Sequence, residues 1–220
     1  MSEEKINIPL LGGALGLIAA VAAIALTAVY LLTLEPIKNA KIAKVNSALK
    51  QVLPIFDTLD KIQKIEAEDK RIIKFYPAKK DGELIGFAGE GSTQKGFNGN
   101  ITVLLGLNLD GSIRKVIVTE HKETAGLGTK ITDRKREKTI LDLFGMGEKY
   151  DESKLPENKI LDQFDAKVAT KEKWEVDKDN GEIDSITGAT VTTRAVTDAI
   201  YTIASTYVKN KEMLKNGDKK

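Results

Sequence analysis

The 220-residue chain contains no cysteine and only one histidine, His121. Without a thiol, disulfides, iron–sulfur clusters, thiolate zinc sites, thioether-linked haem and a lipid-modified cysteine anchor are all excluded. A single histidine also excludes a metal site built from several histidines, and we expect no metal site of any kind. Any redox role of this chain therefore requires an organic cofactor.

The sequence also has no large excess of charge of one sign. It has 34 Lys and Arg residues against 32 Asp and Glu residues, which gives a net charge of +2. A nucleic-acid-binding domain requires a concentrated basic face, so no nucleic-acid partner is expected. With 41% hydrophobic residues, the composition is sufficient for one membrane element and one compact domain.

Charged residues are absent from Ile8 to Leu34. At about 1.5 Å per residue, a helix of this length crosses a hydrocarbon core of about 30 Å. A cleaved signal peptide is the alternative, but its apolar core usually has about 7–15 residues and follows a basic leader. We therefore predict that residues 1–7 form an N-terminal tail and that residues 8–34 form one transmembrane helix in the lipid bilayer.

The segment after the apolar run has the pattern of an amphipathic helix. Apolar residues recur at helical spacing after Pro36 until Pro54 ends the pattern, and they are Ile37, Ile42, Val45, Leu49, Val52 and Leu53. We predict a stalk helix over residues 35–54, which packs on a compact domain over residues 55–210. The Lys-rich residues 211–220 are predicted to be a flexible tail.

Strand-like segments alternate with turn signals in the first half of this domain. Two pairs of such segments flank short turns rich in Asp, Asn and Gly, and the segments are Arg71–Tyr76 with Glu83–Ala88, and Ile101–Leu107 with Ile113–Val118. These pairs predict two hairpins of one antiparallel sheet. The predicted fold class is α+β, with an N-terminal transmembrane helix followed by a compact domain of one antiparallel sheet and flanking helices.

Three other features receive structural interpretations. The glycines between the hairpins are predicted to form an open, flexible connection, and they are Gly86, Gly89, Gly91, Gly96 and Gly99. Residues 135–144 read as a short helix, with three apolar side chains on one face. Trp174 is expected to fill the core, although contact with a cofactor is the alternative.

A glycine-rich motif, His121-Lys122-Glu123-Thr124-Ala125-Gly126-Leu127-Gly128, follows the last predicted strand. Gly126 and Gly128 allow backbone angles that a side chain would forbid, so the main chain can approach a flat ligand. Leu127 can lie on an aromatic ring, while Glu123 and Thr124 offer hydrogen-bonding groups to its polar edge. An ordinary tight turn is the alternative interpretation. We assign no chemistry to His121, because a lone histidine is more often structural.

The stretch Asp184-Ser185-Ile186-Thr187-Gly188-Ala189-Thr190 runs directly into a helical pattern that continues to Val208. Ser185 or Thr187 is placed to cap this helix. The free N–H groups and the dipole of such a helix start favour a phosphate or another anion, and Thr190 offers a hydroxyl beside them. Ordinary capping is one alternative. Another is a hydrolytic nucleophile at Thr190 or Ser185, with His121 as the base.

Together, the two motifs resemble those of the FMN-binding domain in two membrane redox complexes. These are the C subunit of the Na⁺-translocating NADH:quinone reductase (NqrC) and the G subunit of the Rnf ferredoxin:NAD⁺ oxidoreductase (RnfG). In that family the last Thr or Ser of Asp-x-x-Thr-Gly-Ala-Thr carries FMN as a phosphodiester, which implies a covalent FMN on Thr190.

The resemblance implies further roles for the residues of both motifs. Residues of the 187–193 segment would accommodate or bind the phosphate, namely Thr187, Gly188, Ala189, Thr192 and Thr193. The loop that contains Glu123, Thr124, Gly126 and Leu127 would line the isoalloxazine ring. Asp184 would be recognised by the flavin transferase that attaches the cofactor. Lys95-Gly96-Phe97 is similar to another element of the family, and Ala125 stands where the family usually has proline.

The short chain looks more like RnfG than like the longer NqrC. The resemblance implies an electron-transfer subunit of a membrane-bound, ion-translocating ferredoxin:NAD⁺ oxidoreductase, which is not an autonomous catalyst and has no catalytic residue of its own. Its implied partners are other membrane and peripheral subunits and a flavin transferase. The alternatives are NqrC or a related flavin carrier, and a cofactor-free membrane-anchored binding domain.

Two lines of reasoning disagree about the orientation of this chain in the membrane. Lys5 precedes the apolar run and four lysines follow it closely, namely Lys38, Lys41, Lys44 and Lys50. The positive-inside rule therefore places the large domain in the cytoplasm. The family resemblance implies the opposite side, where the transferase works. We follow the resemblance and expect a single-pass protein of the cell (inner) membrane with its FMN domain on the extracytoplasmic side.

Overall fold

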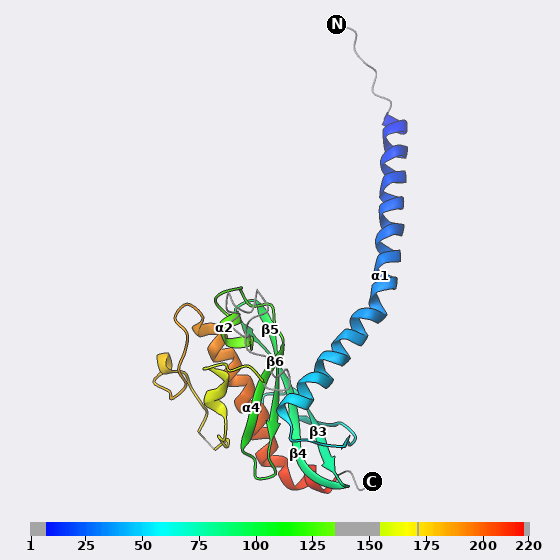
Figure 1. Cartoon of the computed structure of the whole chain (residues 1–220). Coiled ribbons are helices and arrows are strands. Elements are labelled where there is room, and N and C mark those ends of the chain that lie inside the picture. The colour runs from blue at the N-terminus through cyan, green and yellow to red at the C-terminus, as the bar shows by residue number, and fades with distance from the viewer. Residues whose placement is uncertain (1–7, 135–154, 171, 218–220) are drawn as a thin grey trace, which may run out of the picture. The chain divides into compact units, whose positions relative to one another are not determined.

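The computed structural model describes residues 8–134, 155–170 and 172–217. The chain divides into two compact units, the first ending at Lys44 and the second beginning at Val45. Figure 1 shows their elements along the chain. The short helix predicted over residues 135–144 lies outside the described residues.

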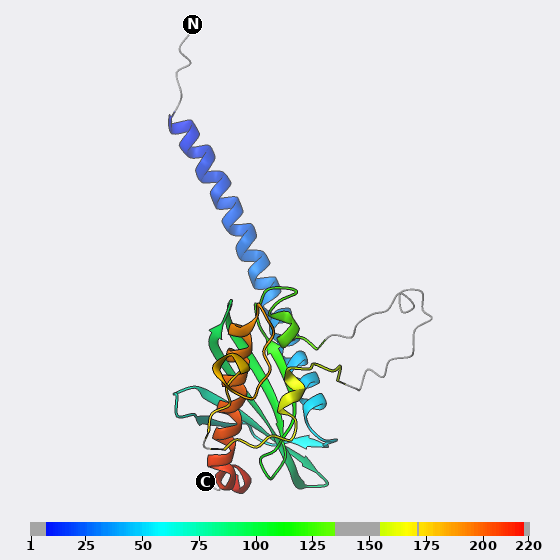
Figure 2. The same cartoon turned by 90° about the vertical axis from the view of Figure 1, so that its left-hand side faces the viewer.

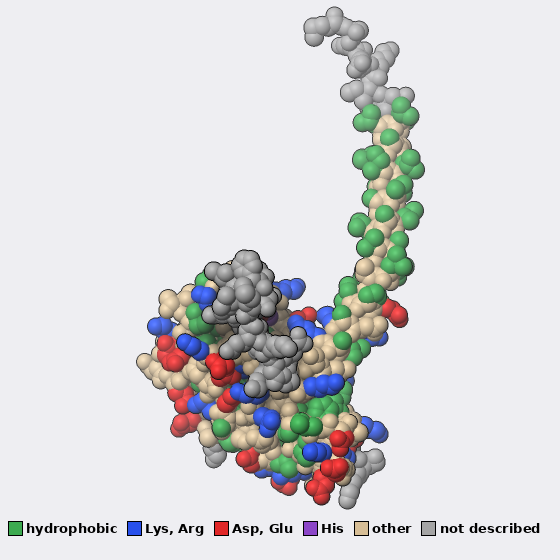
Figure 3. Space-filling model, viewed as in Figure 1, with side chains coloured by type: hydrophobic (Ala, Val, Ile, Leu, Met, Phe, Trp, Pro, Cys, Tyr) green, Lys and Arg blue, Asp and Glu red, His purple; other side chains and the backbone are tan. Residues whose placement is uncertain are grey.

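Helix α1 runs without interruption from Ile8 to Val52. Its most apolar 18-residue window has a mean hydropathy of 2.5 and no buried side chain, so α1 is a candidate transmembrane helix by length and composition. Figure 3 shows the apolar side chains exposed along it. The two helices predicted over residues 8–34 and 35–54 are therefore one helix. Pro36 lies inside this helix, although a proline removes one N–H donor from the hydrogen-bond pattern.

The second unit contains a six-stranded antiparallel sheet with the order β1-β3-β4-β5-β6, in which β2 also pairs with β3. The strands are β1 Thr58–Leu59, β2 Gln63–Glu66, β3 Ile72–Lys80, β4 Glu83–Gly96, β5 Gly99–Leu107 and β6 Ile113–Glu120. The two predicted hairpins correspond to β3-β4 and β5-β6. The α+β class with one antiparallel sheet is thus confirmed.

Two hydrophobic cores lie on opposite faces of this sheet, because successive side chains of a strand point to opposite sides. One core joins the sheet to helix α4, Thr190–Asn216, and the other joins it to the last turns of α1. The alternation is visible in neighbouring pairs, of which the first member faces α4 and the second faces α1: Phe75 and Tyr76, Phe87 and Ala88, and Val103 and Leu104. Figure 2 shows α4 against the sheet.

The glycines between the hairpins do not form the flexible connection that we predicted. Strand β4 continues through Gly86, Gly89 and Gly91 to Gly96. A Cβ atom at Gly89 or Gly91 would collide with Ile203 of α4, so these glycines allow the helix to lie close to the sheet. Their function is close packing rather than flexibility.

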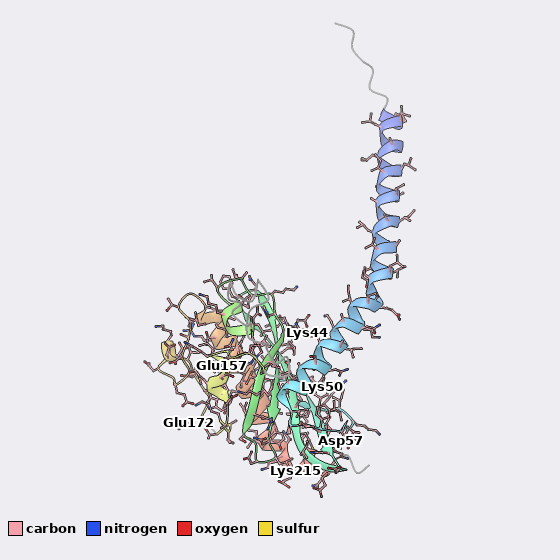
Figure 4. The ribbon with its side chains drawn as sticks, viewed as in Figure 1. Lys44, Lys50, Asp57, Glu157, Glu172 and Lys215 are labelled. Atoms are coloured by element: carbon pink, nitrogen blue, oxygen red, sulfur yellow. The ribbon has the colours of Figure 1, made fainter. Side chains whose placement is uncertain are left out.

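The prediction that a flexible C-terminal tail begins at residue 211 is also wrong. Helix α4 continues to Asn216, and Leu214 is only 1% exposed. The side-chain amide of Gln63 donates a hydrogen bond to the carbonyl oxygen of Leu214 at 3.2 Å. Charged side chains flank this buried leucine on the exposed side of the helix. Figure 4 labels one of them, Lys215, in the last turn. The Lys-rich composition therefore describes the outer face of a helix.

Trp174 fills the core, as expected. It is 8% exposed, and its ring lies 5.7 Å from that of Phe164 and 5.5 Å from that of Tyr201. Phe164 ends the short helix η1, Leu161–Phe164, so the tryptophan ties this irregular region to α4. Such aromatic contacts add about 0.5–1.5 kcal/mol beyond the area that they bury.

Replacement of Gly89 by alanine tests the close packing of α4. The added Cβ would collide with Ile203 and contact Phe75 at 3.1 Å, so Gly89→Ala should lower the free energy of unfolding by about 1–3 kcal/mol. Urea unfolding of the detergent-solubilised chain measures the change. The additional Ile203→Ala substitution should offset part of the loss caused by the clash. Gly13→Ala is the control, because no atom lies within 4 Å of a Cβ there.

Candidate functional site

The two sequence motifs line a single cavity of about 270 Å³ in the second unit. Three segments that are distant in sequence form its walls: the turn after β4, the loop between β6 and the short helix α2 (Thr129–Thr132), and the start of α4. The lining residues are Phe97, Glu123, Thr124, Leu127, Gly128, Gly188, Ala189, Thr190, Val191 and Thr192. The fold therefore brings both motifs to one place.

The carboxylate of Glu123 connects these walls and is only 8% exposed. Its Oε2 accepts a hydrogen bond of 2.6 Å from the Thr192 hydroxyl, and its Oε1 accepts one of 3.2 Å from the backbone N–H of Asn98. A Cβ at Gly128 would approach Oε2 to 2.7 Å, and one at Gly96 would approach Oε1 to 2.8 Å. The two glycines thus leave the space that the carboxylate fills.

The loop around Leu127 is held by hydrogen bonds of its own. The N–H of Leu127 donates to the Thr124 carbonyl at 3.2 Å, and the N–H of Gly126 donates to the Thr129 hydroxyl at 2.9 Å. Gly126 has a φ of 77°, a left-handed conformation that favours glycine. These contacts give the loop a defined turn, although Ala125 stands where the family that this motif resembles usually has proline.

Helix α4 begins without the side-chain cap that we predicted. Its N-cap is Ala189, and no side chain bonds to the free N–H groups of the first turn. The Ser185 hydroxyl instead donates to Asp177 at 2.5 Å, and Thr187 is exposed and does not line the cavity. The reason is a turn closed by Ala189 N–H and the Ile186 carbonyl at 2.9 Å, which separates these side chains from the helix.

The three threonines at the start of α4 lie in different environments. Thr190 is half-buried and lines the cavity. Thr192 also lines it, but its hydroxyl is bonded to Glu123. Thr193 is fully buried, and its hydroxyl donates back to the Ala189 carbonyl at 3.1 Å. The Thr193 hydroxyl is thus occupied within the helix, and its expected role as a phosphate ligand stays a prediction. Only the Thr190 hydroxyl combines access to the cavity with a position at the helix start.

Three apolar side chains beside the cavity are unusually exposed. Phe97 is 69% exposed, Leu127 45% and Val191 44%. A flat aromatic ligand would cover such surfaces and would gain from their burial. Sequence reasoning identified Phe97 and Leu127 but missed Val191 and the backbone of Asn98. The missed residues have no motif, because their roles depend on where the turn after β4 meets α4.

Both ring nitrogens of His121 are hydrogen-bonded. Its Nδ1 accepts from the N–H of Glu123 at 3.3 Å, and its Nε2 lies 2.6 Å from Asp133 Oδ1. An accepting Nδ1 requires the proton on Nε2, which then donates to the carboxylate. The histidine thus supports the loop, and it is not among the cavity-lining residues.

A second hollow of about 300 Å³ shares Val191 with the first. Asp198 of α4 lies in its wall, and the Oδ1 atom of Asp198 accepts hydrogen bonds from Lys95 at 3.1 Å and Lys173 at 2.6 Å. The Arg71 guanidinium reaches Oδ2 at 2.9 Å. Because Lys95 precedes Gly96-Phe97, this network connects α4 to the strand end that carries Phe97.

The pKa of Asp198 reflects these opposing influences. Burial raises it, but the hydrogen bonds from Lys173 and Lys95 and the charge of Arg71 outweigh burial, so the pKa lies below its ordinary value of 3.8. A carboxyl group whose pKa falls on folding stabilises the protein above its unfolded pKa of about 3.9. This stabilisation is lost as the pH falls through the lower, folded pKa.

The fold and the cavity define a class of protein: an α+β domain with a cavity at the start of α4, in a chain that also has one candidate transmembrane helix. The model of the FMN-binding domain family matches residues 96–205, which is half of the chain and includes every residue that lines the cavity. This chain therefore belongs to the FMN-binding domain family.

Curated relatives share one description, the G subunit of an ion-translocating oxidoreductase complex. The Haemophilus influenzae protein is 34% identical over 150 residues, which cover 67% of this chain and 63% of that protein. The Pseudoalteromonas atlantica protein is 36% identical over 140 residues, covering 63% and 56%, respectively. The Shewanella oneidensis protein is 34% identical over 125 residues, covering 57% and 50%. The matched region thus spans less than two thirds of these relatives.

The Asp198 network predicts a change in both stability and its pH dependence. Asp198→Asn should lower the free energy of unfolding by about 1–3 kcal/mol at neutral pH, because the cations lose their charged acceptor. It should also reduce the loss of stability below about pH 4, because the variant lacks the carboxyl group whose pKa is lowered on folding. Urea unfolding of the full chain at neutral and acidic pH measures both. Asp60→Asn removes an exposed partner of Lys79 and should change less. Equal pH dependence in Asp198→Asn and wild type would contradict the assignment.

Proposed function

We propose that the hydroxyl oxygen of Thr190 carries FMN through a phosphodiester bond and that the flavin ring occupies the cavity beside it. The observation that carries this proposal is the meeting of the two motifs at the uncapped start of α4. Membership in the FMN-binding domain family supports the cofactor, and the resemblance to the flavinylation motif supports the attachment.

The residues around Thr190 suit the two ends of this cofactor. The free N–H groups and positive dipole of the α4 start are suited to the phosphate, with Gly188 and Ala189 leaving it room. Phe97, Leu127 and Val191 offer apolar surface to the ring. Thr192 acts through Glu123 rather than by bonding the phosphate.

The size of the cavity is consistent with a relay function. Pockets that enclose drug-sized ligands usually have about 300–1,000 Å³, so 270 Å³ would enclose only part of FMN. An exposed ring edge suits electron exchange with other proteins, and a covalent bond retains a cofactor that is only partly enclosed. FMN would supply the redox chemistry, while the protein holds it and sets its electrostatic environment.

The chain is then an electron-transfer subunit of a membrane-bound, ion-translocating oxidoreductase complex. The description shared by its relatives supports this proposal and favours RnfG over NqrC. As the family implies, the complex would couple electron transfer between ferredoxin and NAD⁺ to ion movement, with other membrane and peripheral subunits as partners. A flavin transferase would recognise Asp184, which is exposed outside the cavity.

The apolar part of α1 would anchor this subunit as a single span in the cell membrane. We place the second unit on the extracytoplasmic side, following the family rather than the lysines after residue 34. Lys44 and Lys50, labelled in Figure 4, belong to the last part of α1, and Lys50 lies in the helix segment that packs on the sheet. Part of this positive charge therefore belongs to the folded domain rather than to the segment beside the membrane that determines orientation.

Loss of the Thr190 hydroxyl should abolish covalent flavin. After co-expression with a flavin transferase, wild type and Thr190→Ser should give a fluorescent band in a denaturing gel, because both retain a hydroxyl at the helix start. Thr190→Val should give a dark band of the same intensity in protein stain. Thr193→Val is the matched control, since its hydroxyl is buried and bonded to Ala189, and it should remain fluorescent. A dark wild-type band, or a fluorescent Thr190→Val band, would refute attachment at Thr190.

The absence of cysteine allows a direct test of the orientation. A single cysteine at the exposed Glu172 should react with a membrane-impermeant maleimide in intact cells, because the second unit would face outward. A cysteine in place of Glu4 should react only after the membrane is opened. The opposite pattern would place the FMN domain in the cytoplasm, as the positive-inside rule predicts.

A further inference from the structure

Glu123 is a buried carboxylate in the cavity wall that has no cationic partner among the residues the structure describes. Asp198, the other buried carboxylate among the described residues, is paired with Arg71, Lys95 and Lys173. Burying an unpaired carboxylate costs stability, so such a group is a candidate for a functional role.

The surroundings of Glu123 hold the carboxylate in position without neutralising its charge. It accepts one hydrogen bond from the Thr192 hydroxyl and one from the Asn98 backbone, both of which are uncharged donors. A carboxylate has about four acceptor positions, so about two are left free on a group that lines the cavity. Gly96 and Gly128 leave the space that the carboxylate occupies, because a side chain at either position would collide with one of its oxygen atoms.

We propose that Glu123 is an electrostatic positioning residue that lowers the reduction potential of the flavin. This inference rests on the proposed function, because it requires FMN in the cavity beside Thr190. Each electron that the flavin accepts adds negative charge unless a proton follows. A fixed carboxylate in the same cavity repels that charge, and the burial of Glu123 limits the water that can screen it. The oxidised flavin is therefore favoured over the reduced one, and the donated electrons pass on more readily to the next centre.

Removal of this charge tests the proposal by redox titration of the full-length flavinylated protein. Glu123→Gln keeps the size of the side chain and removes its charge, so the midpoint potential should shift upward. Glu123→Asp keeps the charge and should retain a potential closer to that of wild type, although its shorter side chain weakens the hydrogen bonds to Thr192 and Asn98. A purely structural role would predict the opposite ranking, because glutamine preserves the packing better than aspartate does.

The matched control is Glu172→Gln, which removes the same charge from an exposed loop outside the cavity (Figure 4). Its potential should equal that of wild type. An unchanged or lower potential in Glu123→Gln would overturn the proposal. Gel fluorescence of the wild type is recorded first, so that a dark band overturns the proposed attachment rather than the role of Glu123.

A second variant keeps the proposal testable if Glu123→Gln does not fold or carry flavin. The exposed side chain of Asn98 donates a hydrogen bond of 3.2 Å to the Thr124 hydroxyl, while its backbone N–H donates separately to Glu123. Asn98→Lys should therefore leave that hydrogen bond in place and add a positive charge nearby, which should raise the potential. Asn98→Gln is the uncharged control for the altered Thr124 contact, so the effect of charge is the difference in potential between the lysine and glutamine variants. If the lysine and glutamine variants have the same potential, the electrostatic role of Glu123 is refuted.

Discussion

The close approach of α4 to the sheet is the constraint on which the site depends. Gly89 and Gly91 leave room for Ile203, and the helix that carries Ile203 begins at Thr190. Because the body of α4 is packed against β4, its first turn has a fixed place beside the loops that leave β4 and β6. A cavity made of loops thus acquires a rigid wall, and the free N–H groups of α4 point to a defined position.

A small number of contacts then convert this geometry into a cofactor site. The 2.6 Å hydrogen bond between Thr192 and Glu123 joins the start of α4 to the loop after β6, and the Asn98 backbone joins the turn after β4 to the same carboxylate. Asp198 makes a parallel connection through Lys95, outside the cavity. Charged and polar side chains therefore position the walls, while Phe97, Leu127 and Val191 leave apolar surface free for a ring. This division suits a protein whose redox chemistry belongs to its cofactor.

Much of the fold and the centre of the site could be predicted from the sequence, because their signals are local. Hairpin turns, the charge-free run after Ile8 and the two motifs each lie within a short stretch. The errors arose where distant contacts decide the outcome. Gly89 and Gly91 look like a loop until α4 is placed against them, and Ser185 looks like a helix cap until its hydroxyl bonds to Asp177. Val191 and Asn98 entered the site only through tertiary packing, which no local pattern encodes.

The most direct test of the central claim is mass spectrometry of the tryptic peptide that spans residues 179–194, from protein made together with a flavin transferase. Cleavage after Lys178 and Arg194 yields one peptide that contains Thr190 together with Ser185, Thr187, Thr192 and Thr193. The account predicts a mass increase equal to FMN less one water, with fragment ions that assign it to Thr190. An unmodified peptide, or a flavin on any of the other four hydroxyl groups, would contradict it.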